Sequence, residues 1–199
     1  MKVSIITATY NSENTINTCM ESVLNQTYGD IEYIIMDGGS EDKTLAIVEE
    51  AVKLSPNIIF KSEPDKGIYD ALNKGIAMAT GEVIGFVHSD DYLADIDVIE
   101  GIVTAFKKES AHGVYGNLHY VAFDNTDKII RNWVSKPYHK KLLKKGWMPA
   151  HPTLFLKKEI YDTYGLFNMN YKIAADYDFV LRVFQQANLK FIYLEKTIF

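Results

Sequence analysis

The chain has 199 residues, of which 47% are hydrophobic and 24% are charged, and its net charge is −5 at pH 7. This composition is ordinary for a soluble globular domain, and the acidic balance argues against general nucleic-acid binding, which favours a basic surface. The single cysteine, Cys19, excludes a disulfide framework within the chain, and no apolar run approaches the ~20 residues that span a bilayer. One cytoplasmic domain is therefore expected.

Short apolar runs alternate with amphipathic, helix-like stretches in the first half of the chain. Runs that are apolar on both faces are typical of strands covered by helices on each side of a parallel sheet, so the predicted fold class is α/β. Strands are predicted at residues 3–9, 31–37, 57–62 and 82–88. Helices are predicted at about residues 13–26, 42–54, 68–80 and 97–108, with Asn11 or Ser12 as the cap of the first.

The character of the chain changes near Gly113. Residues 114–123 and 128–134 are predicted to be two antiparallel strands around a turn at 124–127. A basic segment, a short strand at 153–156, a helix from about 175 to 187 and a last strand at 191–194 follow. We therefore expect a mostly parallel sheet with a small antiparallel part in the second half.

Two adjacent carboxylates, Asp90 and Asp91, follow the predicted strand that ends at His88. Carboxylates at a strand end can hold a divalent ion against a phosphorylated ligand, and hard oxygen ligands suit Mg²⁺ or Mn²⁺. On these residues alone, a turn with two solvated acids and a helix cap is an equally good interpretation.

Polar residues follow all four predicted strands of the first half, at residues 7–11, 37–40, 63–67 and 89–91. Ligands of open parallel sheets bind outside the carboxyl ends of the strands, so these segments predict one polar cleft. Asp37 could accept hydrogen bonds from a nucleobase or ribose there, or simply belong to a strand-to-helix turn. Asp65 lies in a Pro-Asp-Lys-Gly sequence that is a good turn by itself.

Two common phosphate-binding motifs are missing from the sequence. No Gly-x-Gly-x-x-Gly follows the first predicted strand, and no Walker-type loop occurs anywhere. This removes the two commonest routes to binding a dinucleotide or a nucleoside triphosphate. A nucleoside diphosphate held by a metal remains.

Several short segments together carry a family resemblance. They are Thr9-Tyr10-Asn11, Asp37-Gly38-Gly39-Ser40-Glu41-Asp42, Asp65-Lys66-Gly67, Ala71-Leu72-Asn73-Lys74-Gly75, Gly81-Glu82 and Ser89-Asp90-Asp91. In these segments the chain resembles the family-two glycosyltransferases of GT-A fold, inverting enzymes that use nucleotide-sugar donors. The resemblance covers nearly the whole chain and implies a single GT-A domain, 1–199. About 1–112 would bind the nucleotide and about 113–199 the acceptor.

The resemblance also implies which residues bind the donor. Thr9, Tyr10 and Asp37 would contact the base and the nearby sugar of the nucleotide. Asp65 would help to fix the nucleotide, and Asp90 would face the ribose. The donor implied by the family is a nucleoside diphosphate sugar, here expected to be UDP-linked.

Asp91 is the metal ligand that the resemblance implies, for Mg²⁺ or Mn²⁺. The physical argument agrees with this role. A metal that bridges the two phosphates would neutralise the negative charge that builds up as the nucleoside diphosphate leaves.

Inverting transfer needs a base that takes a proton from the acceptor hydroxyl. Asp176 resembles the aspartate of the family's Glu-Asp motif at the start of a helix, although Ala175 stands where a Glu is usual. A helix N-terminus tends to keep an acid ionised, which suits a base but lowers its basicity. The alternative is that Asp176 or Asp178 is only a helix-start acid.

Residues 136–147 form the one basic, aromatic-bearing stretch of the chain. This stretch is either a solvated face or a contact with an anionic membrane surface or with the diphosphate of a lipid-linked acceptor. A peripheral location at the inner face of the membrane is therefore the alternative to a purely cytoplasmic one. His151 resembles a histidine often seen at this place in relatives. It could touch the donor phosphates, the metal or the acceptor, or be a plain core or turn histidine.

The expected function is transfer of one sugar, with inversion, to a hydroxyl of a glycan or a lipid-linked acceptor in polysaccharide or cell-envelope assembly. The family's processive synthases carry a Gln-x-x-Arg-Trp motif and transmembrane helices, and this chain has neither. Relatives commonly continue beyond the last predicted strand, so the chain could lack part of the acceptor or membrane-contact region.

Two other functions stay open at this point. A sugar nucleotidyltransferase would want a Gly-rich, basic loop after the first strand, and residues 7–12 contain no Gly, Lys or Arg. A non-catalytic module that binds a nucleotide sugar is the other, and the missing Glu beside Asp176 is the only hint toward it.

Overall fold

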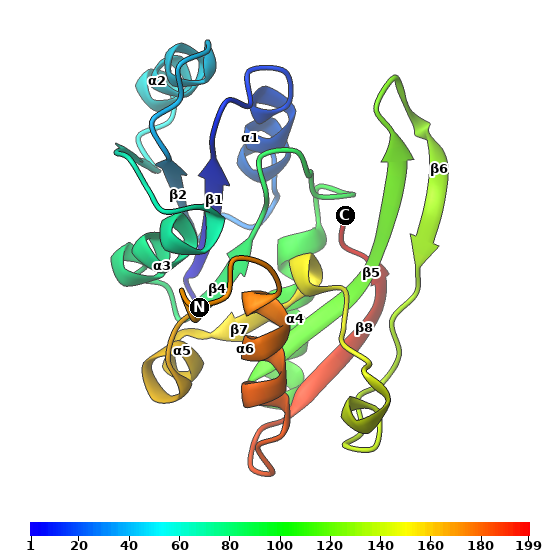
Figure 1. The fold of residues 1–199 in the computed structure, drawn as a ribbon. Coiled ribbons are helices and arrows are strands. Elements are labelled where there is room, and N and C mark those ends of the chain that lie inside the picture. The colour runs from blue at the N-terminus through cyan, green and yellow to red at the C-terminus, as the bar shows by residue number, and fades with distance from the viewer.

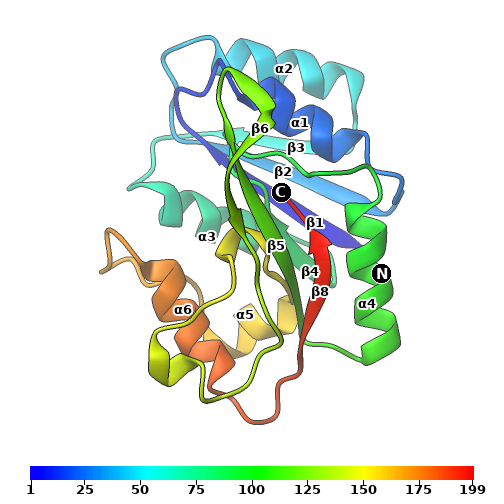
Figure 2. The same ribbon diagram turned by 90° about the vertical axis from the view of Figure 1, so that its right-hand side faces the viewer.

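The computed structural model describes residues 1–199. A sheet of eight strands lies at the centre, with helices on both faces (Figures 1 and 2). The strands are β1 (Val3–Thr9), β2 (Ile31–Asp37), β3 (Ile58–Ser62), β4 (Val83–Phe86), β5 (Gly113–Ala122), β6 (Asn125–Trp133), β7 (Phe155–Lys157) and β8 (Phe191–Thr197). The helices are α1 (Ile16–Leu24), α2 (Thr44–Leu54), α3 (Ile68–Met78), α4 (Val98–Glu109), α5 (Lys158–Tyr164) and α6 (Ala175–Phe184), with 3₁₀-helices η1 (Leu143–Lys145) and η2 (His151–Thr153). None of these helices combines the length and the apolar character that crossing a membrane requires.

The strand order is β3-β2-β1-β4-β7-β5-β6. β1 to β4 are parallel to one another, whereas β7 runs antiparallel between β4 and β5. β8 pairs in parallel with the first half of β5, and β6 pairs antiparallel with its second half. The predicted mostly parallel sheet with an antiparallel second part is therefore confirmed.

Alternation along the buried strands builds two separate cores. In β1, Ile5 packs into a cluster with residues of α1, α2 and α4, whereas Ile6 packs into a cluster with residues of α3, α5 and α6. Figure 2 shows these two groups of helices on opposite faces of the sheet. Successive side chains of a strand point to opposite faces, so a strand buried on both faces is expected to be mostly apolar, apart from polar side chains with hydrogen-bond partners. This explains the continuous apolar runs of the first half.

The predicted cap of the first helix is wrong. α1 begins at Ile16, and no side chain caps it. Asn11 instead has a left-handed φ of 50°, its Oδ1 accepts from the backbone N–H of Glu41, and its own N–H donates to Ser40. Because Asn11 is used in contacts to the loop before α2, it joins the ends of β1 and β2.

Two elements of the second half differ from expectation. α5 follows β7 directly and was not predicted, because no Gly or Pro separates the short strand from the helix. The predicted hairpin is present, but its turn is tighter, since β6 already begins at Asn125. Figures 1 and 2 show β5 and β6 extending beyond the rest of the sheet.

Candidate active site at the ends of β1, β2 and β4

A pocket of about 460 Å³ lies at the carboxyl end of β1, and we call it the donor pocket. Its lining residues come from four separate segments: Ala8, Thr9, Tyr10, Gly38, Asp65, Gly67, Ile68, Ala71 and Ser89. Three of the predicted donor residues, Thr9, Tyr10 and Asp65, are thus brought together here. The Tyr10 side chain is 60% exposed, so its ring is available for stacking, and the buried Thr9 hydroxyl has no hydrogen-bond partner in the protein.

Asp65 reaches the donor pocket because residue 38 is glycine. One Asp65 oxygen accepts a hydrogen bond from the Gly67 N–H at 2.7 Å. The other would lie 2.5 Å from a Cβ atom placed at Gly38, which is closer than any real contact allows. The absence of a side chain at Gly38 therefore leaves the space that this carboxylate occupies.

Asp37 lies beneath the donor pocket rather than on its wall. Its carboxylate is 2% exposed and accepts hydrogen bonds from the N–H groups of Gly39 and Ser40 and from the hydroxyls of Ser40 and Ser62. These contacts hold the turn that shapes the pocket. Direct contact between Asp37 and a nucleotide stays a prediction.

The acidic pair lines a second pocket of about 390 Å³ next to the donor pocket. Asp90 and Asp91 form part of it together with His88 and His151, while Ser89 faces the donor pocket. Burial, and then the charge of Asp90, raise the pKa of Asp91 to about 6. Two neighbouring carboxylates repel each other when both are ionised, and a cation bound beside them would offset this repulsion.

The acidic pair fits a hard divalent cation. No group of three or more His, Cys, Asp or Glu side chains comes together anywhere in the chain in a way that could hold a metal alone. Mg²⁺ and Mn²⁺ in phosphate-transfer sites commonly bind through one or two carboxylates and take the other ligands from water and phosphate. Asp91, with Asp90 beside it in the pocket next to the donor pocket, meets that requirement.

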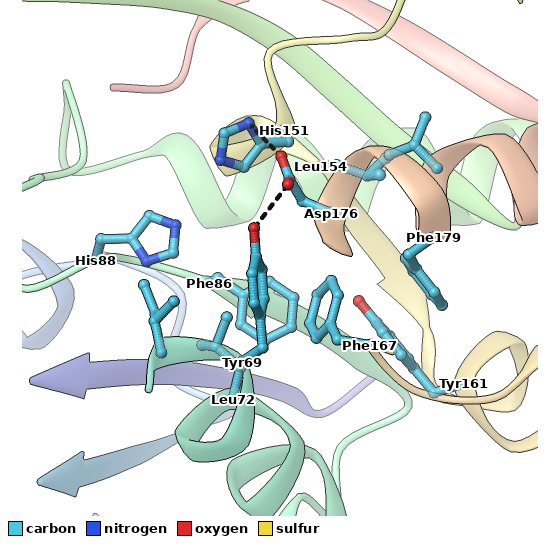
Figure 3. A pocket seen from close by; sticks show the side chains of 12 residues that line it. Tyr69, Leu72, Phe86, His88, His151, Leu154, Tyr161, Phe167, Asp176 and Phe179 are labelled. Carbon is cyan, nitrogen blue, oxygen red and sulfur yellow. Dashed lines mark hydrogen bonds and ion pairs between the residues drawn. The ribbon is translucent and has the colours of Figure 1, made fainter. Parts of the chain in front are cut away.

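Asp176 lies at the start of α6, with both carboxylate oxygens held by other segments (Figure 3). The Tyr69 hydroxyl donates to one oxygen at 2.8 Å, and Nδ1 of His151 lies 3.3 Å from the other. The side chain of Asp176 keeps 19% exposure, so the carboxylate is oriented yet accessible. Burial lowers the pKa of His151, although the negative charge of Asp176 opposes this.

Asp178 is separated from this arrangement. Its carboxylate pairs with Arg182 one turn along α6, at 2.9 Å, and Arg182 also donates to the carbonyls of Tyr164 and Leu166. Asp178 therefore supports the helix and the loop before it, whereas Asp176 lines a pocket.

Sequence reasoning missed two residues of the site. Tyr69 stands two positions after Gly67, in the first turn of α3, and nothing local indicates that its hydroxyl reaches α6. His88 follows β4, and its buried Nδ1 atom has no hydrogen-bond partner in the protein. The position of His88, two residues before Asp90, was the one available signal.

The basic segment 136–147 turns its aromatic residues inward. The Tyr138 ring stacks on Trp147, and its hydroxyl donates to the Phe184 carbonyl at the end of α6. The lysines of the segment are exposed: Lys136, Lys140, Lys141, Lys144 and Lys145. The outer face is thus basic, and contact with a membrane stays a prediction.

Comparison with known proteins identifies the family. The model of "Glycosyl transferase family 2" matches residues 4–165. The chain belongs to glycosyl transferase family 2. This assignment supports glycosyltransferase activity and binding of a nucleotide-sugar donor. The family expected from the sequence is confirmed.

Curated relatives match over most of the chain. A "PGL/p-HBAD biosynthesis glycosyltransferase" of Mycobacterium tuberculosis is 31% identical over 201 residues, which cover 98% of this chain and 74% of that protein. A chondroitin synthase of Escherichia coli is 34% identical over 192 residues, covering 96% of this chain and 27% of that protein.

Solved structures share the fold. TarS 1–349 of Staphylococcus aureus in complex with UDP-GlcNAc has a TM-score of 0.78 at 23% identity, covering 98% of this chain and 59% of that one. The mannosyltransferase PcManGT of Pyrobaculum calidifontis, in complex with GDP-Man and Mn²⁺, has a TM-score of 0.73 at 19% identity, covering 99% and 56%. The chain thus spans a little over half the length of these structures. The predicted GT-A fold is confirmed by this likeness.

Proposed function

We propose that this glycosyl transferase family 2 chain moves one sugar, with inversion, from a UDP-sugar to a hydroxyl of a glycan or lipid-linked acceptor. The observation that carries the proposal is the Asp176 carboxylate, which accepts a hydrogen bond from Tyr69 and lies against His151, beside the donor and acidic pockets. The expected setting is polysaccharide or cell-envelope assembly, in line with the chondroitin synthase among the relatives.

Asp176 acts as the base in this proposal. Its carboxylate takes the proton of the acceptor hydroxyl while that oxygen forms a bond to the anomeric carbon. The bond from the anomeric carbon to the diphosphate breaks on the opposite side, and the nucleoside diphosphate leaves with the electron pair. Tyr69 and His151 keep the two oxygens of Asp176 directed at the acceptor.

Donor binding is assigned to the residues of the first two pockets. Tyr10 stacks on the base, Thr9 and Asp65 contact the nucleoside, and Asp90 approaches the ribose from the neighbouring pocket. Asp37 holds the turn under the nucleoside. A divalent metal held by Asp91 would neutralise charge on the departing diphosphate.

Isothermal titration with UDP, GDP and CDP, each with and without Mn²⁺, tests the donor site. UDP is expected to bind in a Mn²⁺-dependent manner, and Asp91→Ala is expected to lose that dependence because the cation loses a carboxylate. Asp95→Ala is the matched control, since Asp95 is an exposed acid outside both pockets.

Two outcomes contradict the proposal. If none of the three nucleotides bound, the transferase assignment for this chain would be removed. Retention of Mn²⁺-dependent binding in Asp91→Ala would move the metal to other ligands. Once a donor is found, the anomeric configuration of the product, measured by NMR, decides between inversion and retention.

A further inference from the structure

A third, smaller pocket of about 80 Å³ opens directly beneath Asp176 (Figure 3). Nine of its twelve lining residues are hydrophobic, and five of these nine carry aromatic rings: Tyr69, Phe86, Tyr161, Phe167 and Phe179. Its polar lining side chains other than Tyr161 are those around the carboxylate: Tyr69, His88, His151 and Asp176. We call this apolar pocket the Tyr161 pocket. The donor pocket, the pocket of the acidic pair and Asp176 meet at its entrance.

The Tyr161 hydroxyl is the one polar group deep in this pocket. The residue is 2% exposed, with its ring stacked on Phe179 at 5.1 Å and edge-on to Phe86 at 6.3 Å. No group of the protein hydrogen-bonds to its hydroxyl, and burial alone raises its pKa, so it is a neutral donor. Figure 3 shows this oxygen among the aromatic rings of the pocket.

The Tyr161 hydroxyl has no hydrogen-bond partner within the protein and lines the pocket, so it is free to donate to a ligand that enters. The volume limits what that ligand can be. An apolar cavity of about 150 Å³ accommodates a benzene molecule. The Tyr161 pocket is about 80 Å³, so it fits a substituent of a few heavy atoms rather than a ring.

The chemistry of the walls narrows the substituent further. It must place an apolar end against aromatic rings and a hydrogen-bond acceptor near one hydroxyl. An acetamido group has a methyl group and a carbonyl oxygen in this relation. A hydroxyl or hydroxymethyl group has no apolar end to place against the aromatic rings. A charged group would lose its hydration in the pocket without gaining an opposite charge.

We propose that the Tyr161 pocket binds the acetamido group of the acceptor sugar, with the carbonyl oxygen accepting from Tyr161 and the methyl group packing on Phe86 and Phe179. This inference rests on the proposed function, since the base contacts the acceptor. The pocket shares Asp176 with the base site but only Ile68 with the donor pocket. The chain therefore selects acetamido sugars as acceptors.

Ligand binding measured without turnover tests this pocket. Saturation-transfer difference NMR, with UDP and Mn²⁺ present, would compare the methyl glycosides of N-acetylglucosamine and N-acetylgalactosamine with their non-acetylated counterparts. An acetylated glycoside is expected to bind, with the strongest transfer to its acetamido methyl. Tyr161→Phe keeps the ring and removes the donor, and is expected to weaken that binding roughly three- to tenfold.

Tyr164→Phe is the matched control, because Tyr164 lies one turn along α5 outside the pocket. It is expected to leave all affinities unchanged. Equal binding of acetylated and non-acetylated glycosides, or an unchanged affinity in Tyr161→Phe, would overturn the proposal and leave the hydroxyl to a bound water.

The acetamido group in this pocket could also belong to the donor sugar. A second experiment distinguishes the donor sugar from the acceptor sugar. Titrations with UDP-N-acetylglucosamine and UDP-glucose are expected to be unaffected by Tyr161→Phe. A loss confined to the acetylated donor would assign the pocket to the donor and overturn the acceptor assignment. Failure of UDP itself to bind would instead count against the proposed function, so the two failures are distinguishable.

Discussion

Asp176 illustrates how contacts with distant segments fix the orientation of a single carboxylate. An acid in the first turn of a helix is favoured by the helix dipole, and this alone would explain Asp178. Asp176 differs because both its oxygens are held by side chains from α3 and η2. Fixed geometry of this kind matters for catalysis, since a base must lie within hydrogen-bond reach of the proton that it removes.

Asp176→Asn is expected to reduce sugar transfer roughly 10²- to 10⁴-fold, because the amide cannot accept the proton. The affinity for UDP is expected to stay the same, since Asp176 does not line the donor pocket. Initial rates and nucleotide titration on the same sample measure the two effects separately.

Asp178→Asn is the companion variant on the same helix. It is expected to keep transfer and to lower the melting temperature, since Arg182 loses its carboxylate partner. If Asp176→Asn transferred sugar at the normal rate, the base would have to be another residue.

At the scale of elements, β4 controls the position of the acidic pair. The strand has only four residues, and it lies between β1 and β7, with only Val87 between its end and the His88–Asp91 segment. Gly85 lets β4 lie beneath the Phe155 ring of β7: a Cβ atom there would be 2.1 Å from the ring. A shift of β4 would therefore carry both carboxylates with it.

Gly85→Ala is expected to lower the free energy of unfolding by about 1–3 kcal/mol, since the added methyl group would overlap the buried Phe155 ring and force it to shift. Weaker Mn²⁺-dependent nucleotide binding is expected in parallel. Chemical denaturation and titration measure the two effects.

Gly29→Ala is the control, because nothing lies within 4 Å of a Cβ atom there, and it is expected to stay within about 0.5 kcal/mol of the parent. Equal stability of both variants would show that Phe155 can move.

At the scale of the whole molecule, one buried acid joins three distant segments. Glu32 in β2 is 6% exposed and accepts hydrogen bonds from Lys2, from Ser4 of β1 and from Thr80 after α3. Burial opposes its ionisation, but these hydrogen bonds outweigh burial and lower its pKa from 4.5 to about 2. The ionised form therefore holds the amino-terminal edge of the sheet together.

Glu32→Gln is expected to destabilise the protein by about 3 kcal/mol at neutral pH. The neutral amide lacks the charge that Lys2, Ser4 and Thr80 stabilise in the folded state. The folded pKa lies below the unfolded one, so the contribution is complete above pH 4.5 and is lost as the pH falls toward 2. Urea denaturation between pH 7 and pH 3 measures it. The difference from the parent should shrink with acidification, whereas the exposed Glu49→Gln should show no difference at any pH. A difference that did not change with pH would mean that packing, not ionisation, causes the loss.

The local pattern of the sequence was sufficient for the first half of the fold. Strands such as β1 and β2 begin and end at the predicted residues because they are mostly apolar and buried on both faces. Strand ends in a parallel sheet lie at one edge, so the approach of Thr9, Tyr10 and Asp65 to one pocket was predictable as well. The identity of the family followed from the same segments.

The tertiary structure alone decided how the side chains are used. Asp37 turns into its own loop and not into the donor pocket, because four donors around it satisfy the carboxylate. Tyr69 reaches Asp176 across 107 residues of sequence, and no local pattern encodes such a contact. The free hydroxyl of Tyr161 likewise depends on three packed elements. Hydrophobic spacing and turn chemistry act over a few residues and determine elements, whereas the direction of a side chain depends on which distant elements pack against it.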